Sequence, residues 1–414
     1  MNRRELLSWS VRGLGAAAVM DLLQREPGVA ADRELDYRLP AKARRAVQIS
    51  LIGGLSHLDS LDYKPKLAEL HGKSLKTDTP PDIFFNQVGL LRQADWEFQQ
   101  RGASGLWMSD LFPHLAKFAD DLTVIRSMVA DSANHTPALF VENSGFQFNG
   151  YPSLGSWLSY GLGSESENLP TFVVLPDGRS EPNGGSSNWT SGFLPAQHQG
   201  VAFRSGAEPV QNLNPARPIT GDEDAATRAF LTSLNERHLE ESGGEAALGA
   251  RIRSYELAAR MQLAVPAVAD LSQESAETQA AYGLDRPETA DCGRRCLLAR
   301  RLLEQGVRFV QIYSGGAIGG SPRASWDAHE SVKQNHTLEA SLIDQPVAAL
   351  LADQKQRGML DDTLVLFTTE FGRTPFTQSA ADVVGAGRDH NKYAFSLWLA
   401  GAGLKPGIAY GASD

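Results

Sequence analysis

Residues 360–375, LDDTLVLFTTEFGRTP, are the stretch that decides the fold. Within it, residues 363–369 are short, apolar and β-branched without alternation, which predicts a parallel strand covered on both faces. The strand is followed at once by Glu370, Phe371, a glycine and Arg373. Because open α/β sheets bind ligands just beyond the carboxyl ends of their strands, Glu370 and Arg373 stand where chemistry is expected.

The rest of the chain supplies partners for this strand. Further strands are expected at residues 46–52, 122–128, 171–175 and 394–400 and in the run VRFVQIYSGG, and helices at 106–119, 224–240, 246–265, 293–305 and 338–357 and from Pro137 onward. The alternation of helix and strand in the second half of the chain predicts a mostly parallel sheet. Residues 176–214 are rich in Gly, Ser, Asn and Pro, which is typical of a rim over a site.

The bulk composition narrows the class of protein. The 414 residues carry a net charge of 39 − 49 = −10, and no dense basic patch occurs, which argues against nucleic acid as a partner. No stretch approaches the roughly 20 apolar residues of a membrane span. The only two cysteines, Cys292 and Cys296, lie four apart in an expected helix, where two buried thiols are favoured over a strained disulfide.

The first residues have the pattern of an export signal. Arg3 and Arg4 precede a mildly apolar stretch, and small residues at 29–31 suit a cleavage site, so residues 1–31 are interpreted as a twin-arginine signal. The expected location is therefore the periplasm or the cell surface. Arg12 and Asp21 interrupt the apolar stretch, and the alternative is an amphipathic helix of a cytosolic protein.

Carboxylate and imidazole groups gather in loops next to the expected strands. They are Asp59 and Asp62, Asp327 and His329, Glu370, and Asp389 with His390. This mixture suits Zn²⁺ or Mn²⁺, whereas carboxylates alone suit Mg²⁺ or Ca²⁺. A metal pair would clamp a phosphoryl or sulfuryl group, and Arg373 would hold an anionic oxygen through two hydrogen bonds. The alternative for the loop after the first strand is a solvated turn with helix-capping aspartates.

A second group of candidates precedes the expected helix from Pro137. Asn134, His135 and Thr136 lie before this helix, and a helix N-terminus favours a bound anion. Asn134 is therefore a candidate for substrate binding. His135 is equally compatible with a capping or packing role.

Several motifs in combination resemble an exported bacterial family called domain of unknown function 1501. They are GGLSHLDSLDYKP, CLLARRLLEQGVRFVQIY, WDAHE, DDTLVLFTTEFGRTP and GRDHN followed by FSLWLAGAGLKPG. Members of that family resemble the alkaline phosphatase and sulfatase superfamily. The resemblance implies an alkaline-phosphatase-like α/β/α sandwich around a mostly parallel sheet, with two divalent metal ions. One domain would cover residues 40–414, with an irregular insertion around 176–290.

The resemblance also assigns roles to metal-binding residues. TLVLFTTEFG is similar to the sulfatase segment T-L-V-V-F-T-S-D-H-G, so Glu370 falls on a metal-binding aspartate and Phe371 on a metal-binding histidine. His390 is the expected replacement for that histidine, with Asp389 orienting it or binding metal itself. Asp59 or Asp62 resembles the aspartate after the first strand, and Asp327 with His329 resembles the next ligand pair.

The comparison with sulfatases also shows that the usual nucleophilic cysteine is absent. Sulfatases carry C-x-P-S-R, and HTPALFVENSG has His135 in the place of the cysteine, with Thr136 as the neighbouring hydroxyl. His135 and Thr136 are therefore the candidate catalytic residues. The family pattern continues past Asp414, which implies a truncated C-terminal part.

These observations predict an exported, metal-dependent hydrolase of sulfate or phosphate esters, acting on a small anionic ester or a sulfated polymer. The ions would be Zn, Mn, Ca or Mg. The alternative is a non-catalytic exported binding protein on a degenerate hydrolase scaffold, because Phe371 and His135 depart from the superfamily pattern. The pattern identifies neither the substrate nor the oligomeric state.

Overall fold

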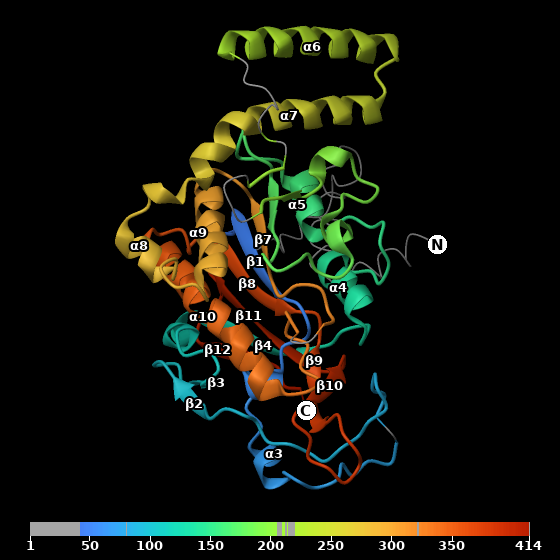
Figure 1. Cartoon of the computed structure of the whole chain (residues 1–414), viewed down its shortest axis with the longest axis vertical. Coiled ribbons are helices and arrows are strands. Elements are labelled where there is room, and N and C mark those ends of the chain that lie inside the picture. Colours follow the sequence, from blue (N-terminus) through green and yellow to red (C-terminus); the bar gives the residue numbers. More distant parts are fainter. Residues whose placement is uncertain are drawn as a thin grey trace, which may run out of the picture.

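An eight-stranded, mostly parallel sheet forms the centre of the chain (Figure 1). The computed structural model describes residues 42–79, 81–204, 209–211, 213, 220–320 and 323–413. The strand order is β12-β4-β11-β8-β1-β7-β5-β6. The strands are β1 (Arg45–Leu51), β4 (Leu122–Met128), β5 (Phe172–Leu175), β6 (Val201–Ala202), β7 (Phe309–Ser314), β8 (Thr363–Thr369), β11 (Phe395–Gly401) and β12 (Ile408–Tyr410).

The strand β8, on which the sequence argument rests, lies inside this sheet. It pairs in parallel with β1, and β1 pairs in parallel with β7. The strand β11 runs antiparallel to both of its neighbours, β4 and β8. The sequence did not reveal this one reversed strand, and the expected mostly parallel sheet is confirmed.

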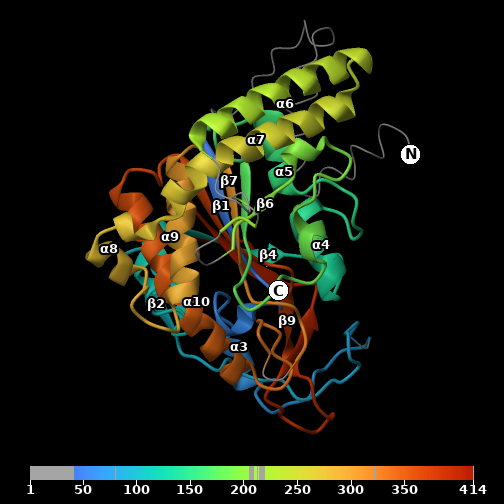
Figure 2. The same ribbon diagram turned by 45° about the horizontal axis from the view of Figure 1, so that its top comes forward.

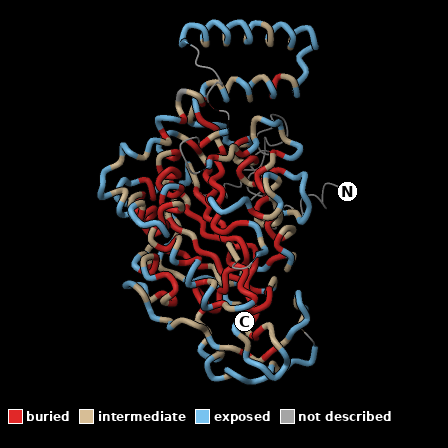
Figure 3. Tube along the Cα trace, in the orientation of Figure 1, coloured by how far each residue is buried: buried red, intermediate tan, exposed pale blue. Residues whose placement is uncertain are grey.

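Helices cover both faces of the sheet, which confirms the expected α/β/α sandwich (Figures 1 and 3). Side chains of a strand alternate between faces. Val47 and Ile49 of β1 join the core formed with α9 (Ala290–Glu304) and α10 (Val332–Gln356). On the opposite face, Tyr313 of β7 packs in a second core with α4 (His135–Ser144) and α5 (Leu154–Leu162).

Two expectations about local structure are wrong. Residues 106–119 were expected to be one helix, but β3 (Leu106–Ser109) pairs antiparallel with β2 (Phe98–Arg101), and a 3-10 segment follows at Leu115–Asp121. Pro113 lies between these two elements and lacks the backbone donor that a continuous helix needs.

The second error concerns the motif GRDHN, which was expected in a loop. It forms β10 (Arg388–Asn391), which pairs antiparallel with β9 (Gly372–Thr377). In this two-stranded sheet His390 lies opposite Arg373. The pairing places the motifs EFGRTP and GRDHN side by side.

The remaining helices lie outside the central layers or at their edges. They are α3 (Pro65–Glu69), α6 (Gly221–Glu241), α7 (Ala246–Ala269) and α8 (Ala276–Ala281). Figures 1 and 2 show α6 and α7 as an antiparallel pair at one end of the molecule. Among the described residues, none of the helices combines the length and hydropathy needed to cross a bilayer. The expected export signal, residues 1–31, lies outside the described residues.

Candidate metal centre

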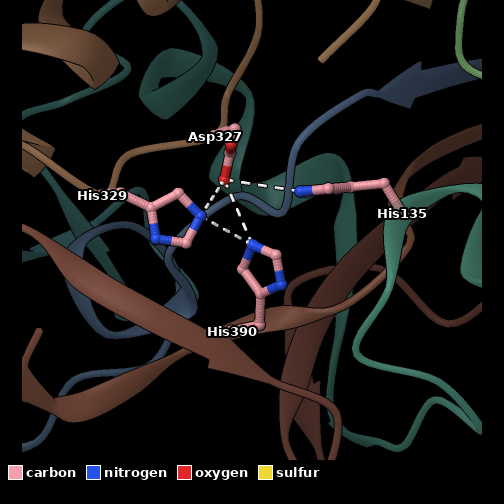
Figure 4. A group of neighbouring side chains, drawn as sticks. All are labelled: His135, Asp327, His329 and His390. Atoms are coloured by element: carbon pink, nitrogen blue, oxygen red, sulfur yellow. Dashed lines mark hydrogen bonds and ion pairs between the residues drawn. The ribbon is translucent and has the colours of Figure 1, made fainter. Parts of the chain in front are cut away.

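Four buried side chains from separate parts of the chain converge beyond the carboxyl ends of β7 and β8 (Figure 4). Asp327 and His329 belong to the loop after β7, His135 begins α4, and His390 lies on β10. One donor atom from each residue lies within 4.8 Å of all the others. Figure 4 shows the carboxylate of Asp327 facing the three imidazole rings.

The contacts within this cluster centre on one oxygen, Oδ1 of Asp327. The Nε2 atom of His329 lies 2.7 Å from it, that of His390 3.2 Å, and that of His135 3.5 Å. The Nε2 atoms of His329 and His390 are 2.9 Å apart. A tetrahedral ion at about 2.0–2.1 Å from each donor separates neighbouring donors by about 3.3 Å, which is close to these spacings.

The hydrogen-bond partner of each Nδ1 atom, on the side of the ring away from Asp327, determines which nitrogen carries the proton. The Nδ1 atom of His135 donates to Oε1 of Glu370 at 2.9 Å, and Nδ1 of His390 donates to the carbonyl of Ala133 at 2.6 Å. The Nδ1 atom of His329 contacts Oε1 of Gln378. Because these oxygens accept, each ring in its neutral form carries its proton on Nδ1 and directs an Nε2 lone pair at Asp327.

This arrangement fits a bound cation. Two lone pairs facing each other at 2.9 Å on His329 and His390 repel unless a proton or a metal ion lies between them. Within the described part of the chain, the buried Nε2 of His135 has no hydrogen-bond partner. Three imidazoles and one carboxylate are donors that suit Zn²⁺ or Mn²⁺, since Mg²⁺ and Ca²⁺ prefer oxygen ligands.

The electrostatics of the cluster keep Asp327 charged and His390 neutral. Burial opposes the charge of Asp327, but the neighbouring groups, the guanidinium of Arg373 first among them, outweigh burial and hold the pKa of Asp327 far below its usual value. Burial, aided by the nearby positive charge of Arg373, lowers the pKa of His390. Burial disfavours protonated His135, yet the nearby carboxylates of Asp327 and Glu370 outweigh burial and raise its pKa as long as no cation is bound.

Two glycines allow the backbone segments to approach closely enough to build the cluster. Gly53 has a φ of 120°, and a Cβ atom there would lie 2.3 Å from the backbone nitrogen of Asp327. A Cβ atom on Gly387 would lie 1.6 Å from the carbonyl oxygen of His329. Only glycine fits at such distances, so these residues set the positions of the loop after β7 and of β10.

Glu370 lies beside the cluster and makes its contact through His135. Its Oε1 accepts from the backbone nitrogen of Gly53 at 2.7 Å as well as from His135. Its Oε2 accepts from the nitrogen of Gly54 at 3.2 Å and from the hydroxyl of Thr369 at 3.1 Å. These four hydrogen bonds fix the carboxylate of Glu370, which therefore orients the ring of His135.

Two arginines contact Asp327 and differ in exposure. Arg373 is fully buried, donates to Oδ1 of Asp327 at 2.7 Å, and directs its other donors to backbone carbonyls, including that of Gly54 at 2.9 Å. Arg323 contacts Oδ2 of Asp327 from a partly exposed position and also binds exposed Glu330 at 2.8 Å. No pattern in the sequence pointed to Arg323.

The structure does not bring the other candidate residues into the cluster. Asp59 is bound by Arg388 at 3.0 Å, Ser56 at 2.5 Å and the nitrogen of Asp95 at 2.9 Å. Asp62 accepts from Ser413 at 2.7 Å.

Three further candidates lie near cluster residues without joining them. Asp389 accepts backbone hydrogen bonds from His390 at 2.7 Å and from Phe85 at 2.9 Å. Asn134 is the N-cap residue of α4, without a side-chain capping bond, and Thr136 in the first turn is partly buried.

Phe371, which the sequence resemblance aligned with a metal-binding histidine, packs against the cluster. It is fully buried, and its ring centroid lies 4.5 Å from that of His390 and 5.0 Å from that of His135. His390 therefore lies next to position 371, where the resemblance implied a histidine ligand. Sequence reasoning also missed Gln378 and Ala133, because the hydrogen-bonding partners of ligand residues have no local signature.

Comparisons with known proteins identify a family and a set of solved structures. The family described as "Protein of unknown function (DUF1501)" matches residues 43–414. No curated protein matches the sequence.

Three of the similar solved structures are the following. A phosphonate monoester hydrolase from Silicibacter pomeroyi is 12% identical, with 73% of this chain and 65% of that chain aligned and a TM-score of 0.33. A sulfatase from Pseudoalteromonas sp. is 11% identical over 99% and 68%, with a TM-score of 0.36. An alkaline phosphatase from the Antarctic bacterium TAB5 is 11% identical over 90% and 95%, with a TM-score of 0.35.

Proposed function

The chain belongs to the DUF1501 family, and we propose that this member is a metal-dependent hydrolase of phosphate or sulfate esters. The observation that carries the proposal is the convergence of three Nε2 atoms on one oxygen of Asp327, with each opposite Nδ1 bound to an oxygen. Buried imidazoles with such partners are costly to maintain without a cation.

The proposed ligands of one ion are His135, Asp327, His329 and His390. Zn²⁺ or Mn²⁺ would supply a Lewis acid for the phosphoryl or sulfuryl oxygen and would lower the pKa of a bound water. Glu370 orients His135, and Arg373 holds Asp327 in place. Within the described residues this is the one group of three or more potential ligands, so the proposal is for a single ion rather than the expected pair.

Arg323 is the proposed contact for the anionic group of the substrate. It already contacts the cluster, and its side chain is 21% exposed, whereas the side chain of Arg373 has no exposed surface. A guanidinium can exchange one oxyanion for another while keeping bidentate geometry. Arg323 would thus leave Oδ2 of Asp327 for an oxygen of the ester.

The proposed reaction is attack by water on phosphorus or sulfur. The water oxygen forms the new bond and gives up one proton, the bond to the leaving oxygen breaks, and the leaving oxygen takes up one proton, so that the products are the alcohol and inorganic phosphate or sulfate. The hydrogen bonds of the four ligand side chains go to no Ser, Thr or Cys side chain in the described parts of the chain, which favours water as the nucleophile. Thr136 stays the candidate for a hydroxyl nucleophile, and Thr136→Ala distinguishes the two routes.

The proposal is tested by metal content and turnover together. Purified protein should hold about one equivalent of metal and hydrolyse 4-nitrophenyl phosphate or sulfate, and a chelator should abolish both. His329→Ala should lose the metal, while His238→Ala, which removes an exposed histidine on α6, should keep it. Metal-free protein, or equal metal content in the two variants, would contradict the assignment.

A metal-dependent binding protein is the second candidate. Two observations favour it. Phe371 stands where the resemblance implied a histidine ligand, and the guanidinium of Arg373, expected to bind the substrate anion, is completely buried. It predicts a saturable anion ligand, bound with the metal, without turnover of any ester. Its substrate-like ligand would be the same small anionic ester or sulfated polymer.

Export through the N-terminal signal belongs to the same proposal. Cell fractionation of the full chain and of Arg3→Lys with Arg4→Lys would test it. Retention of the double variant in the cytoplasm is the expected result.

A further inference from the structure

We propose that Phe84 and Phe85 form an aromatic wall at the metal centre and select esters whose leaving group is aryl or otherwise apolar. The inference rests on the proposed function, because it names the substrate class of the same site. Neither residue belongs to a recognised motif of the sequence, and neither contributes a metal ligand.

The two rings lie directly against the cluster. The centroid of Phe84 is 5.1 Å from that of His390, and the centroid of Phe85 is 4.8 Å from that of His329 in an edge-on arrangement. The two phenylalanines also contact each other at 4.9 Å. They therefore pack on the outer side of two proposed ligands.

The exposure of these rings is unusual for their position. Phe84 is 44% and Phe85 46% exposed, while His329 and His390 beneath them are 9% and 2% exposed. Two adjacent, half-exposed phenylalanines beside a buried polar cluster leave apolar surface in water, which is unfavourable unless something covers it. An apolar group of a substrate would cover it while the anionic group reaches the cluster.

One backbone hydrogen bond and two side-chain contacts hold this wall in place. The backbone nitrogen of Phe85 donates to Asp389, the neighbour of His390, at 2.9 Å. Asp82 binds the ammonium group of Lys392 at 2.8 Å and the hydroxyl of Tyr393 at 2.7 Å. Both attachments lead to residues 389–393, so the wall and the ligand His390 are held on one strand and its extension.

The chemistry of the pair selects against highly polar leaving groups. A phenyl ring gains from edge or offset contact with another aromatic ring, and a methyl group covers little of the surface. An aromatic contact of this kind changes affinity by about tenfold. Binding of non-hydrolysable anions therefore measures the preference without any turnover.

The experiment is calorimetric titration of metal-loaded protein with phenylphosphonate, methylphosphonate, benzenesulfonate and methanesulfonate. We expect the phenyl compound of the preferred pair to bind about tenfold more tightly than its methyl counterpart. Phe84→Ala and Phe85→Ala should reduce this ratio towards one, and Phe85→Leu should give an intermediate ratio. Phe230→Ala removes a phenylalanine that is 64% exposed on α6, away from the cluster, and should leave the ratio unchanged.

The outcomes separate this inference from the proposed function. Equal binding of phenyl and methyl anions by the unaltered chain, or an unchanged ratio in the two alanine variants, would overturn the aromatic wall alone. Failure of all four anions to bind metal-loaded protein would overturn the proposed function, and the wall with it. Metal affinity, measured in every variant, should stay unchanged and shows that the cluster is intact.

Discussion

Replacing Glu370 with glutamine should weaken metal binding without removing a ligand. Oε1 of Glu370 accepts from His135 and from Gly53, and Oε2 accepts from Gly54 at 3.2 Å. In Glu370→Gln the amide oxygen can keep the first two hydrogen bonds, so the amide nitrogen then faces the nitrogen of Gly54. The ring of His135 keeps its orientation but loses a charged partner.

The magnitude follows from these contacts. The charged carboxylate raises the basicity of His135 as a ligand, and mutating such a hydrogen-bonding partner costs about 10–100-fold in metal affinity, equivalent to about 1.4–2.7 kcal/mol. The unsatisfied nitrogen of Gly54 costs about 1–3 kcal/mol of folding free energy. Both effects should appear in the same variant.

Competition with a chromogenic chelator measures the affinity, and denaturant unfolding measures the stability. For the metal affinity alone, the matched control is Glu142→Gln, since Glu142 is a carboxylate on α4 that binds Ser50 at 2.9 Å and does not contact the cluster. An unchanged metal affinity in Glu370→Gln would refute a role of the Glu370 charge in metal binding by His135. Complete loss of metal would instead make Glu370 a direct ligand, as the sequence resemblance implied.

Three further predictions concern the cluster and its surroundings. His390→Ala should lose metal in equilibrium dialysis, because it removes one of four donors, and retained metal would contradict its role. Gly53→Ala should destabilise the chain by more than about 1–2 kcal/mol in urea unfolding, since its Cβ would lie 2.3 Å from the nitrogen of Asp327 at a φ of 120°. Burial raises the pKa of Glu142 from 4.5 to about 7. The Glu142 carboxyl therefore binds its proton more tightly in the folded chain than in the unfolded chain. Protonation of Glu142 contributes about 3 kcal/mol to the free energy of unfolding below pH 4.5, and this contribution is lost as the pH rises to 7. Glu142→Gln should flatten that part of the stability curve, and an unaltered curve would exclude Glu142 as its origin.

The sequence was most informative where local pattern and tertiary environment agree. Residues 363–369 form β8 as expected, because an unbroken β-branched apolar run has few stable alternatives to a buried strand. The pattern at 106–119 failed, because the pairing of β3 with β2 outweighed a weak helical periodicity. The reversed direction of β11 depends on long-range pairing that no local pattern encodes.

In the candidate site, too, the sequence predicted residue types and positions but not the contacts that depend on packing between distant segments. Asp327, His329 and His390 were expected as ligands from composition and resemblance, and the structure brings them together with His135. His135 was expected as a nucleophile or a proton-transfer group, because a motif reveals position and residue type but not which atoms a ring faces. The burial of Arg373 and the contact of Arg323 with Asp327 depend on side-chain packing between distant segments.

The most direct measurement for the whole account is anomalous scattering at the zinc or manganese absorption edge from crystals of the metal-loaded chain. One peak should lie about 2.0–2.3 Å from Asp327 and from the Nε2 atoms of His135, His329 and His390. A protein that takes up no metal, or a peak bound by Asp59 or Asp62 with these four residues unoccupied, would contradict it.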